Sequence, residues 1–256
     1  MKNRIQKLFE IKKNNIVSIY FTAGFPKLND TLEIIKNLND AGVDMIEIGM
    51  PFSDPLADGP IIQQSNTVAI ANGMTVPLLL EQLKHIRKIT SIPLVLMGYL
   101  NPILQFGEER FIAALHEIGI DGIIIPDMPL DYYEKTVQPL TEKYHIANIL
   151  LVAPTTSPER ITYIDSLSNG FIYLVSSNGI TGSNKDIKAQ QVYFDKIKAM
   201  NLKNPTLIGF GIHDKKTVTD AFSNSQGAII GSAFVKTIKA LGTGPETIQN
   251  FIKGLQ

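Results

Sequence analysis

Two acidic residues, Glu47 and Asp58, lie where a carboxyl group could take part in proton transfer. Glu47 belongs to the apolar run Met45–Gly49, which is typical of a buried strand. Side chains alternate between the two faces of a strand, so Glu47 points away from the face that carries Ile46 and Ile48. If those isoleucines face surrounding helices, Glu47 faces the interior of a sheet or barrel.

A carboxylate that points into an apolar interior is costly unless it has partners or remains protonated. Both conditions change its pKa, and a raised pKa suits proton transfer at neutral pH. Glu47 stands near the C-terminal end of its strand, which favours chemistry. The alternative is a buried structural glutamate held by hydrogen bonds.

Asp58 lies in a loop stiffened by Pro51, Pro55 and Pro60, because proline fixes φ. A stiff loop could hold Asp58 opposite Glu47. Asp58 could equally cap a helix that begins at Pro60. Spacing does not separate these two interpretations.

Eight β-rich runs alternate with segments of helical periodicity, which indicates a parallel sheet with right-handed crossovers. Eight repeats in one chain of this length predict a single (β/α)8 TIM barrel over residues 1–256, and an open doubly wound sheet is the alternative. The first residues predict an additional N-terminal amphipathic helix with Ile5, Leu8 and Phe9 on one side. The expected strands are 16–21, 45–49, 93–97, 122–125, 149–152, 171–175, 206–209 and 228–230.

Glycine-bearing loops follow the last three expected strands, at Asn178–Gly182, Gly209–Gly211 and Gly231–Ser232. Glycine lets backbone N–H groups approach an anion, and a helix N-terminus adds a favourable dipole. Barrels often bind phosphate with the loops after strands 7 and 8. The three loops together therefore predict a phosphate site, although each alone could be an ordinary turn.

Tyrosines near strand ends could line a substrate pocket, because an aromatic ring packs on a flat ligand and offers a hydroxyl. These residues are Tyr20, Tyr99 and Tyr173, and Ile62 and Leu96 could supply apolar walls. Ordinary filling of the barrel is the alternative for such side chains.

Composition narrows the possible functions. The chain has no cysteine, and its 24 basic and 24 acidic residues cancel, so we expect neither thiolate chemistry nor a nucleic-acid surface. None of the four histidines forms a pair with metal-ligand spacing, so no metal is expected. No apolar run suggests a signal peptide or a membrane span, and we expect a cytoplasmic protein with no membrane partner.

Glu47 followed by Pro51-Phe-Ser-Asp-Pro-Leu-Ala-Asp-Gly-Pro60 resembles the signature of the tryptophan synthase alpha subunit family. The resemblance extends over essentially the whole chain. It includes Thr22-Ala-Gly-Phe-Pro26, Met97-Gly-Tyr-Leu-Asn-Pro102, Pro126-Asp-Met-Pro129, Asn178-Gly-Ile-Thr-Gly182, Gly209-Phe-Gly-Ile212 and Gly231-Ser232.

This resemblance implies a lyase that splits indole-3-glycerol phosphate into indole and glyceraldehyde 3-phosphate by a retro-aldol reaction. It implies that Glu47 carries protons, that Asp58 binds the indole N–H, and that Tyr173 assists orientation. Asp127 would steady mobile loops, and Thr181 would contact substrate. The implied phosphate contacts are Gly182, Gly211, Gly231 and Ser232.

The resemblance also implies a partner, a beta subunit that holds pyridoxal phosphate, in an alpha2beta2 heterotetramer. This chain itself would need no cofactor. Ser177 stands where many members carry a basic residue. Three alternatives remain: a stand-alone indole-releasing lyase, a phosphosugar isomerase, and a catalytically silent regulatory subunit.

Overall fold

A computed structural model describes residues 3–176 and 184–255, with side chains of the second range from residue 190 onward. Eight parallel strands follow one another around a closed barrel, and β8 pairs with β1. Closure confirms the predicted (β/α)8 barrel and excludes the open doubly wound sheet. The strands are β1 (Ile16–Thr22), β2 (Met45–Gly49), β3 (Leu94–Met97), β4 (Gly122–Ile124), β5 (Ala147–Val152), β6 (Ile172–Val175), β7 (Thr206–Gly209) and β8 (Gly227–Ile230).

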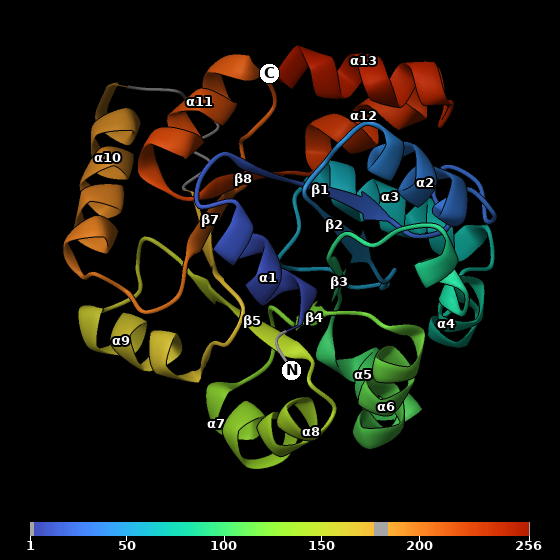
Figure 1. The fold of residues 1–256 in the computed structure, drawn as a ribbon, viewed down its shortest axis with the longest axis horizontal. Coiled ribbons are helices and arrows are strands. Elements are labelled where there is room, and N and C mark those ends of the chain that lie inside the picture. Colours follow the sequence, from blue (N-terminus) through green and yellow to red (C-terminus); the bar gives the residue numbers. More distant parts are fainter. Residues whose placement is uncertain (1–2, 177–183, 256) are drawn as a thin grey trace.

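Helices form a ring around the strands and cover the outer face of the barrel, whereas α1 lies across one end of it (Figure 1). Their apolar faces pack against the outward side chains of the strands, so that strands and helices share one core. They are α1 (Arg4–Ile11), α2 (Thr31–Asp40), α3 (Pro60–Ala71), α4 (Val76–Leu83), η1 (Ile86–Lys88), α5 (Leu100–Phe106), α6 (Glu108–Ile118), α7 (Leu130–Tyr132), η2 (Tyr133–Val137), α8 (Gln138–Lys143), α9 (Pro158–Leu167), α10 (Asn184–Ala199), α11 (Lys215–Asn224), α12 (Ser232–Leu241) and α13 (Pro245–Leu255).

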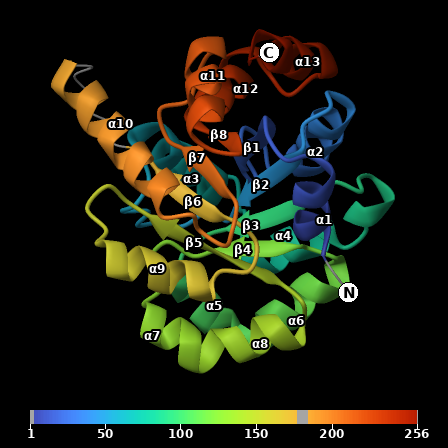
Figure 2. The same ribbon diagram turned by 60° about the vertical axis from the view of Figure 1, so that its left-hand side comes forward.

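The additional N-terminal helix is confirmed as α1. Asn3 begins it with a capping box, in which its side chain accepts a hydrogen bond from the Gln6 N–H and the Gln6 side chain binds back. Ile5 is fully buried, and Leu8 and Phe9 pack against the core. Asn3 and Arg4 bind Asp121, directly before β4, so α1 lies across the N-terminal end of the barrel. Figure 2 shows α1 at the opposite side of the molecule from α10.

The largest difference from the predicted strands is at β5, which begins two residues early. Ala147 and Asn148 pair with Gly122 and Ile123 of β4. Alanine and asparagine are depleted in strands, so local preference predicts no strand there. Pairing with β4 overrides that preference.

Strand register decides which side chains enter the barrel. Tyr20 lies beside Glu47 across β1 and β2, and Glu47 lies beside Val95 of β3. Neighbouring residues in register point to the same face, so these three side chains share the inner face. Ser18, two residues before Tyr20, also points inward, as its contact with Glu47 shows.

The N-terminal end of the barrel holds a buried ion cluster. Asp121 is almost fully buried, and its carboxylate accepts hydrogen bonds from Arg87 and, at 3.1 Å, from Arg4. It also accepts the backbone N–H of Leu94 at 3.0 Å. Both oxygens are therefore satisfied, as burial of a charge requires. This end of a barrel contributes stability.

Candidate active site

Glu47 is fully buried inside the barrel, as strand alternation predicts. One carboxyl oxygen, Oε1, accepts a hydrogen bond from the Ser18 hydroxyl at 2.8 Å. The other oxygen, Oε2, is buried and has no hydrogen-bond partner among the described residues. Burial raises the pKa of Glu47 to about 8, although the Ser18 hydrogen bond acts in the opposite direction. The group is therefore mostly protonated at neutral pH.

Asp58 does not cap a helix. The residue that begins α3 is Gly59, and no side chain caps this helix. The Asp58 carboxylate instead accepts a hydrogen bond from the Tyr99 hydroxyl at 3.2 Å, while that hydroxyl accepts the Ala57 N–H at 3.0 Å. Burial raises the pKa of Asp58 to about 6, against the lowering effect of Tyr99. At neutral pH Asp58 is mostly ionised, unlike Glu47.

Tyr20 and Tyr173 stand beside these acids, and each occupies space that a glycine leaves open. A Cβ added to Gly49 would lie 2.2 Å from the Tyr20 hydroxyl, and one added to Gly209 would lie 2.0 Å from the Tyr173 hydroxyl. Burial, with the nearby charges of Glu47 and Asp58, raises the pKa of both tyrosines well above the usual value. Both hydroxyls therefore stay protonated and available as donors.

A chain of hydroxyl groups joins Tyr20 to α3. The Tyr20 hydroxyl lies 3.5 Å from Thr22 Oγ1, which lies 2.6 Å from Ser65 Oγ. Ser65 donates to the Ile62 carbonyl oxygen at 2.8 Å. Ile62 is almost fully buried in the first turn of α3, so this chain fixes it beside the pocket tyrosine.

The structure contradicts the prediction that Leu96 forms a pocket wall. The register pairs Leu96 with Ile48, which neighbours Glu47 and therefore points to the opposite face. Leu96 faces the helices, and Met97, paired with Gly49, points inward at the mouth. Val95 pairs with Glu47 and therefore points inward, and Met97, two residues later on the same strand, points inward as well.

Tyr99 connects the loop after β3 to the loop after β2 at the mouth. Its ring stacks on Phe52 with centroids 5.1 Å apart, while its hydroxyl binds Asp58. The carboxylate of Asp127, in the loop after β4, accepts the N–H of Leu100 at 2.9 Å. Asp127 thus ties the loop after β4 to the start of α5.

The predicted phosphate residues that the structure describes lie after β7 and β8. Gly211 has φ +72° and follows Phe210, at φ +69°, so the chain turns sharply there. Gly231 begins α12 and Ser232 is its first residue, and no side chain caps this helix. Among the described residues no side chain accepts from its first N–H groups, which suit an anion. Thr181 and Gly182 lie outside the described residues.

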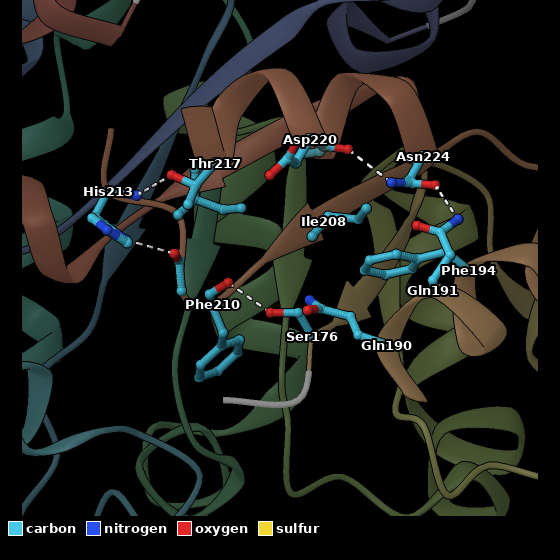
Figure 3. A pocket seen from close by; sticks show the side chains of 13 residues that line it. Ser176, Gln190, Gln191, Phe194, Ile208, Phe210, His213, Thr217, Asp220 and Asn224 are labelled. Atoms are coloured by element: carbon cyan, nitrogen blue, oxygen red, sulfur yellow. Dashed lines mark hydrogen bonds between the residues drawn. The ribbon is translucent and has the colours of Figure 1, made fainter. Parts of the chain in front are cut away.

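A hollow of about 480 Å³ lies between α10, α11 and the segment after β7 (Figure 3). Ser176 donates to the Phe210 carbonyl oxygen at 2.7 Å along one side of it. Neither Glu47 nor Asp58 lines this hollow, which is therefore separate from the acids at the mouth. Its lining residues are Ser176, Gln190, Gln191, Phe194, Ile208, Phe210, Gly211, Ile212, His213, Thr217, Asp220, Ala221 and Asn224.

Among the described side chains, those of residues 3–176 and 190–255, no group of three or more acidic or histidine residues is arranged to hold a metal ion. Within the same residues, no helix is long and apolar enough to cross a membrane.

A closed parallel barrel with two buried carboxyl groups of raised pKa toward its C-terminal mouth has the arrangement of a (β/α)8-barrel enzyme, in which the active site lies at that mouth. The family profile described as tryptophan synthase alpha chain matches residues 5–253. The chain belongs to the tryptophan synthase alpha chain family. It is a lyase and acts in tryptophan biosynthesis as a tryptophan synthase alpha chain.

Individual relatives agree with this assignment. The chain is 56% identical over 252 residues to the tryptophan synthase alpha chain of Flavobacterium psychrophilum, covering 98% of each. It is 49% identical to that of Parabacteroides distasonis, covering 99% of each. Among solved structures, tryptophan synthase subunit alpha from Legionella pneumophila superposes with a TM-score of 0.88 at 31% identity, covering 100% of this chain and 97% of that one. A chain of tryptophan synthase from M. tuberculosis superposes with a TM-score of 0.87 at 26% identity, covering 99% and 98%.

Proposed function

We propose that Glu47 and Asp58 together cleave indole-3-glycerol phosphate to indole and glyceraldehyde 3-phosphate. The observation that carries this proposal is the difference in pKa between two acids that lie near the same two tyrosines, Tyr20 and Tyr173. Burial places the pKa of Glu47 at about 8 and that of Asp58 at about 6, so at neutral pH one is an acid and the other an anion. Such separated values mark acid and base roles.

Glu47 transfers the protons. Its neutral carboxyl group donates a proton to C3 of the indole ring, which becomes cationic. The resulting carboxylate accepts the proton of the hydroxyl on the adjacent carbon. The carbon–carbon bond then breaks, its electron pair returns to the ring, and the former alcohol becomes the aldehyde. Glu47 ends protonated, as it began, so no external acid or base is consumed.

Asp58 stabilises the cation that forms when C3 is protonated. Its carboxylate accepts a hydrogen bond from the indole N–H, where the positive charge develops. The Tyr99 hydroxyl orients this carboxylate through its hydrogen bond. Asp127 supports the same region, because it fixes the first N–H of α5 beside Tyr99.

The phosphate is held at the far side of the mouth. The N-terminus of α12, at Gly231 and Ser232, and the sharp turn at Gly211 offer backbone N–H groups to it. We assign Gly182 to the same phosphate and Thr181 to the substrate on the family resemblance. Binding energy from the phosphate positions the distant reacting bond.

Apolar and aromatic side chains hold the indole ring. Tyr173 orients the substrate from β6, and Tyr20 and Ile62 form one wall, joined through Thr22 and Ser65. Met97 forms the opposing wall, in place of Leu96.

The partner is a tryptophan synthase beta subunit that holds pyridoxal phosphate, in an alpha2beta2 assembly in the cytoplasm. This chain, as one domain over 1–256, contributes no cofactor. The segment Pro51–Pro55 and the residues around Asn101 form the proposed contact surface. The side chain of Leu56, which follows this segment, is 90% exposed, as expected of a residue that a partner covers.

An indole-release assay tests the proposal. Wild-type protein, with and without a beta subunit, should release indole from indole-3-glycerol phosphate, faster when the partner is present. Asp58→Asn should lower kcat by about 10²–10³-fold, because an amide cannot stabilise the developing cation as an anion does. No indole from the wild type, or wild-type turnover by Asp58→Asn, contradicts it.

A further inference from the structure

A single hydroxyl group holds Glu47 from inside the barrel. Ser18 is fully buried on β1, and its hydroxyl lies 2.8 Å from Glu47 Oε1. We propose that Ser18 is a positioning residue that selects Oε2 of Glu47 as the oxygen that carries the transferred proton. This inference rests on the proposed function, because it concerns the same proton.

The two oxygens of Glu47 have different surroundings. Oε1 accepts from Ser18, whereas Oε2 is buried with no partner among the described residues. In a neutral carboxyl group the carbonyl oxygen is the better acceptor and the other oxygen bears the hydrogen. Because Ser18 donates to Oε1, Oε1 is the carbonyl oxygen and the proton lies on Oε2. An unsatisfied buried oxygen is costly, and a substrate atom that takes the Oε2 proton satisfies it.

Ser18 acts through Glu47 rather than on the substrate. It precedes Tyr20 by two residues on the inner face of β1, and Tyr20 is the residue in register with Glu47. Ser18 therefore lies one layer deeper in the barrel than the acid. The titratable groups that act electrostatically with Glu47 are Tyr20 from β1 and Tyr173 from β6, and Asp58 from the loop after β2 acts on the same two tyrosines. None of these donates a hydrogen bond to Glu47 in the part of the chain that the structure describes, so the orientation of its carboxyl group depends on Ser18.

Removal of this hydroxyl should have two measurable consequences. The Ser18 hydrogen bond lowers the pKa of Glu47, so in Ser18→Ala the alkaline limb of the kcat/KM profile should move upward by about one pH unit. The carboxyl group would also lose its fixed orientation, which should lower kcat at neutral pH by about tenfold. KM should stay near the wild-type value, because Ser18 does not contact substrate.

The experiment compares kcat, KM and the pH profile of indole release for Ser18→Ala, Ser18→Thr and the wild type. Ser18→Thr keeps a hydroxyl on the same carbon. It should therefore restore both kcat and the wild-type position of the alkaline limb of the pH profile. The matched control is Ser168→Ala, which removes a buried hydroxyl 3.2 Å from the carbonyl oxygens of Asn148 and Phe171, away from the acids. It should leave kcat and the limb unchanged.

An unmoved alkaline limb in Ser18→Ala, or a loss of kcat that Ser18→Thr does not restore, overturns the positioning role. If Ser18→Ala does not fold, Ser18→Cys carries the same measurement, with a smaller upward shift expected because a thiol is a weaker donor. Glu47→Gln separates the two proposals. Full activity of that variant overturns the proposed function, whereas an inactive Glu47→Gln with wild-type behaviour of Ser18→Ala overturns this inference alone.

Discussion

Buried acids lie at both ends of this barrel, in opposite surroundings. At the N-terminal end Asp121 is 2% exposed, and two arginines and a backbone N–H satisfy its oxygens. Toward the C-terminal mouth Glu47 is 0% exposed, and one hydroxyl is its hydrogen-bond donor among the described residues. Equal burial thus accompanies an ion pair at one end and an unpaired, mostly protonated acid at the other.

The comparison separates stability from catalysis. A buried acid whose oxygens are all paired holds strands and helices together. A buried acid without a cation has a raised pKa and an unsatisfied oxygen, which is unfavourable for folding but useful for proton transfer. Substitution at the two ends should therefore affect different measurements.

The largest expected effect is on activity at the mouth. Glu47→Gln keeps the size and neutrality of the side chain but removes the proton, so indole release should fall by about 10²–10⁴-fold. Its free energy of unfolding should equal or exceed that of the wild type, and the advantage should grow between about pH 4.5 and 8. Over that range the wild-type fold binds a proton that the unfolded chain has released, so its stability falls as pH rises. Denaturant unfolding at several pH values measures this, and a large loss of stability with retained turnover would reverse the comparison.

The next effect is on stability at the opposite end. Asp121→Ala leaves Arg87 half-buried without its partner, so the free energy of unfolding should fall by about 3–5 kcal/mol. Indole release per folded molecule should remain near wild type at low temperature. Lys36→Ala, which breaks the exposed pair between Lys36 and Asp40, is the control and should cost less than about 0.5 kcal/mol.

A smaller effect should come from the glycine beneath Tyr173. In Gly209→Ala the new methyl group would overlap the Tyr173 hydroxyl, so the ring must shift, at a cost of about 1–3 kcal/mol in unfolding. Because the ring lies in the pocket, KM should rise as well. Gly244→Ala meets no atom within 4 Å and serves as the control. An unchanged KM in Gly209→Ala would show that the position of Tyr173 does not matter for substrate binding.

Periodicity alone predicted most of the fold, because eight alternating strands and helices in one chain have few compact arrangements. It also placed Glu47 inside the barrel, since alternation along β2 is a local property. The strand assignments were least accurate at β5, where Asn148 pairs with β4 against its local preference.

The sequence alone could not predict which side chains of different strands contact one another. Ser18 and Glu47 are 29 residues apart, and no local pattern shows that their side chains meet. Leu96 was assigned to the pocket because it lies near a strand end, but register with Ile48 turns it outward. For Asp58, the sequence allowed either a helix cap or an acid at the mouth of the barrel. The structure excludes the cap, because Gly59 begins α3.

The pH dependence of kcat/KM for indole release tests the central claim most directly, because it reports the ionisation of the free enzyme. We predict a bell-shaped profile, with an acid limb near pH 6 from Asp58 and an alkaline limb near pH 8 from Glu47. The substrate phosphate also ionises at about pH 6, but it does so with either enzyme. An acid limb that is lost in Asp58→Asn on the same substrate therefore belongs to Asp58. A rate that falls above about pH 8 agrees with a protonated Glu47 as the reactive form. A rate that instead rises through pH 8 to a plateau would contradict it.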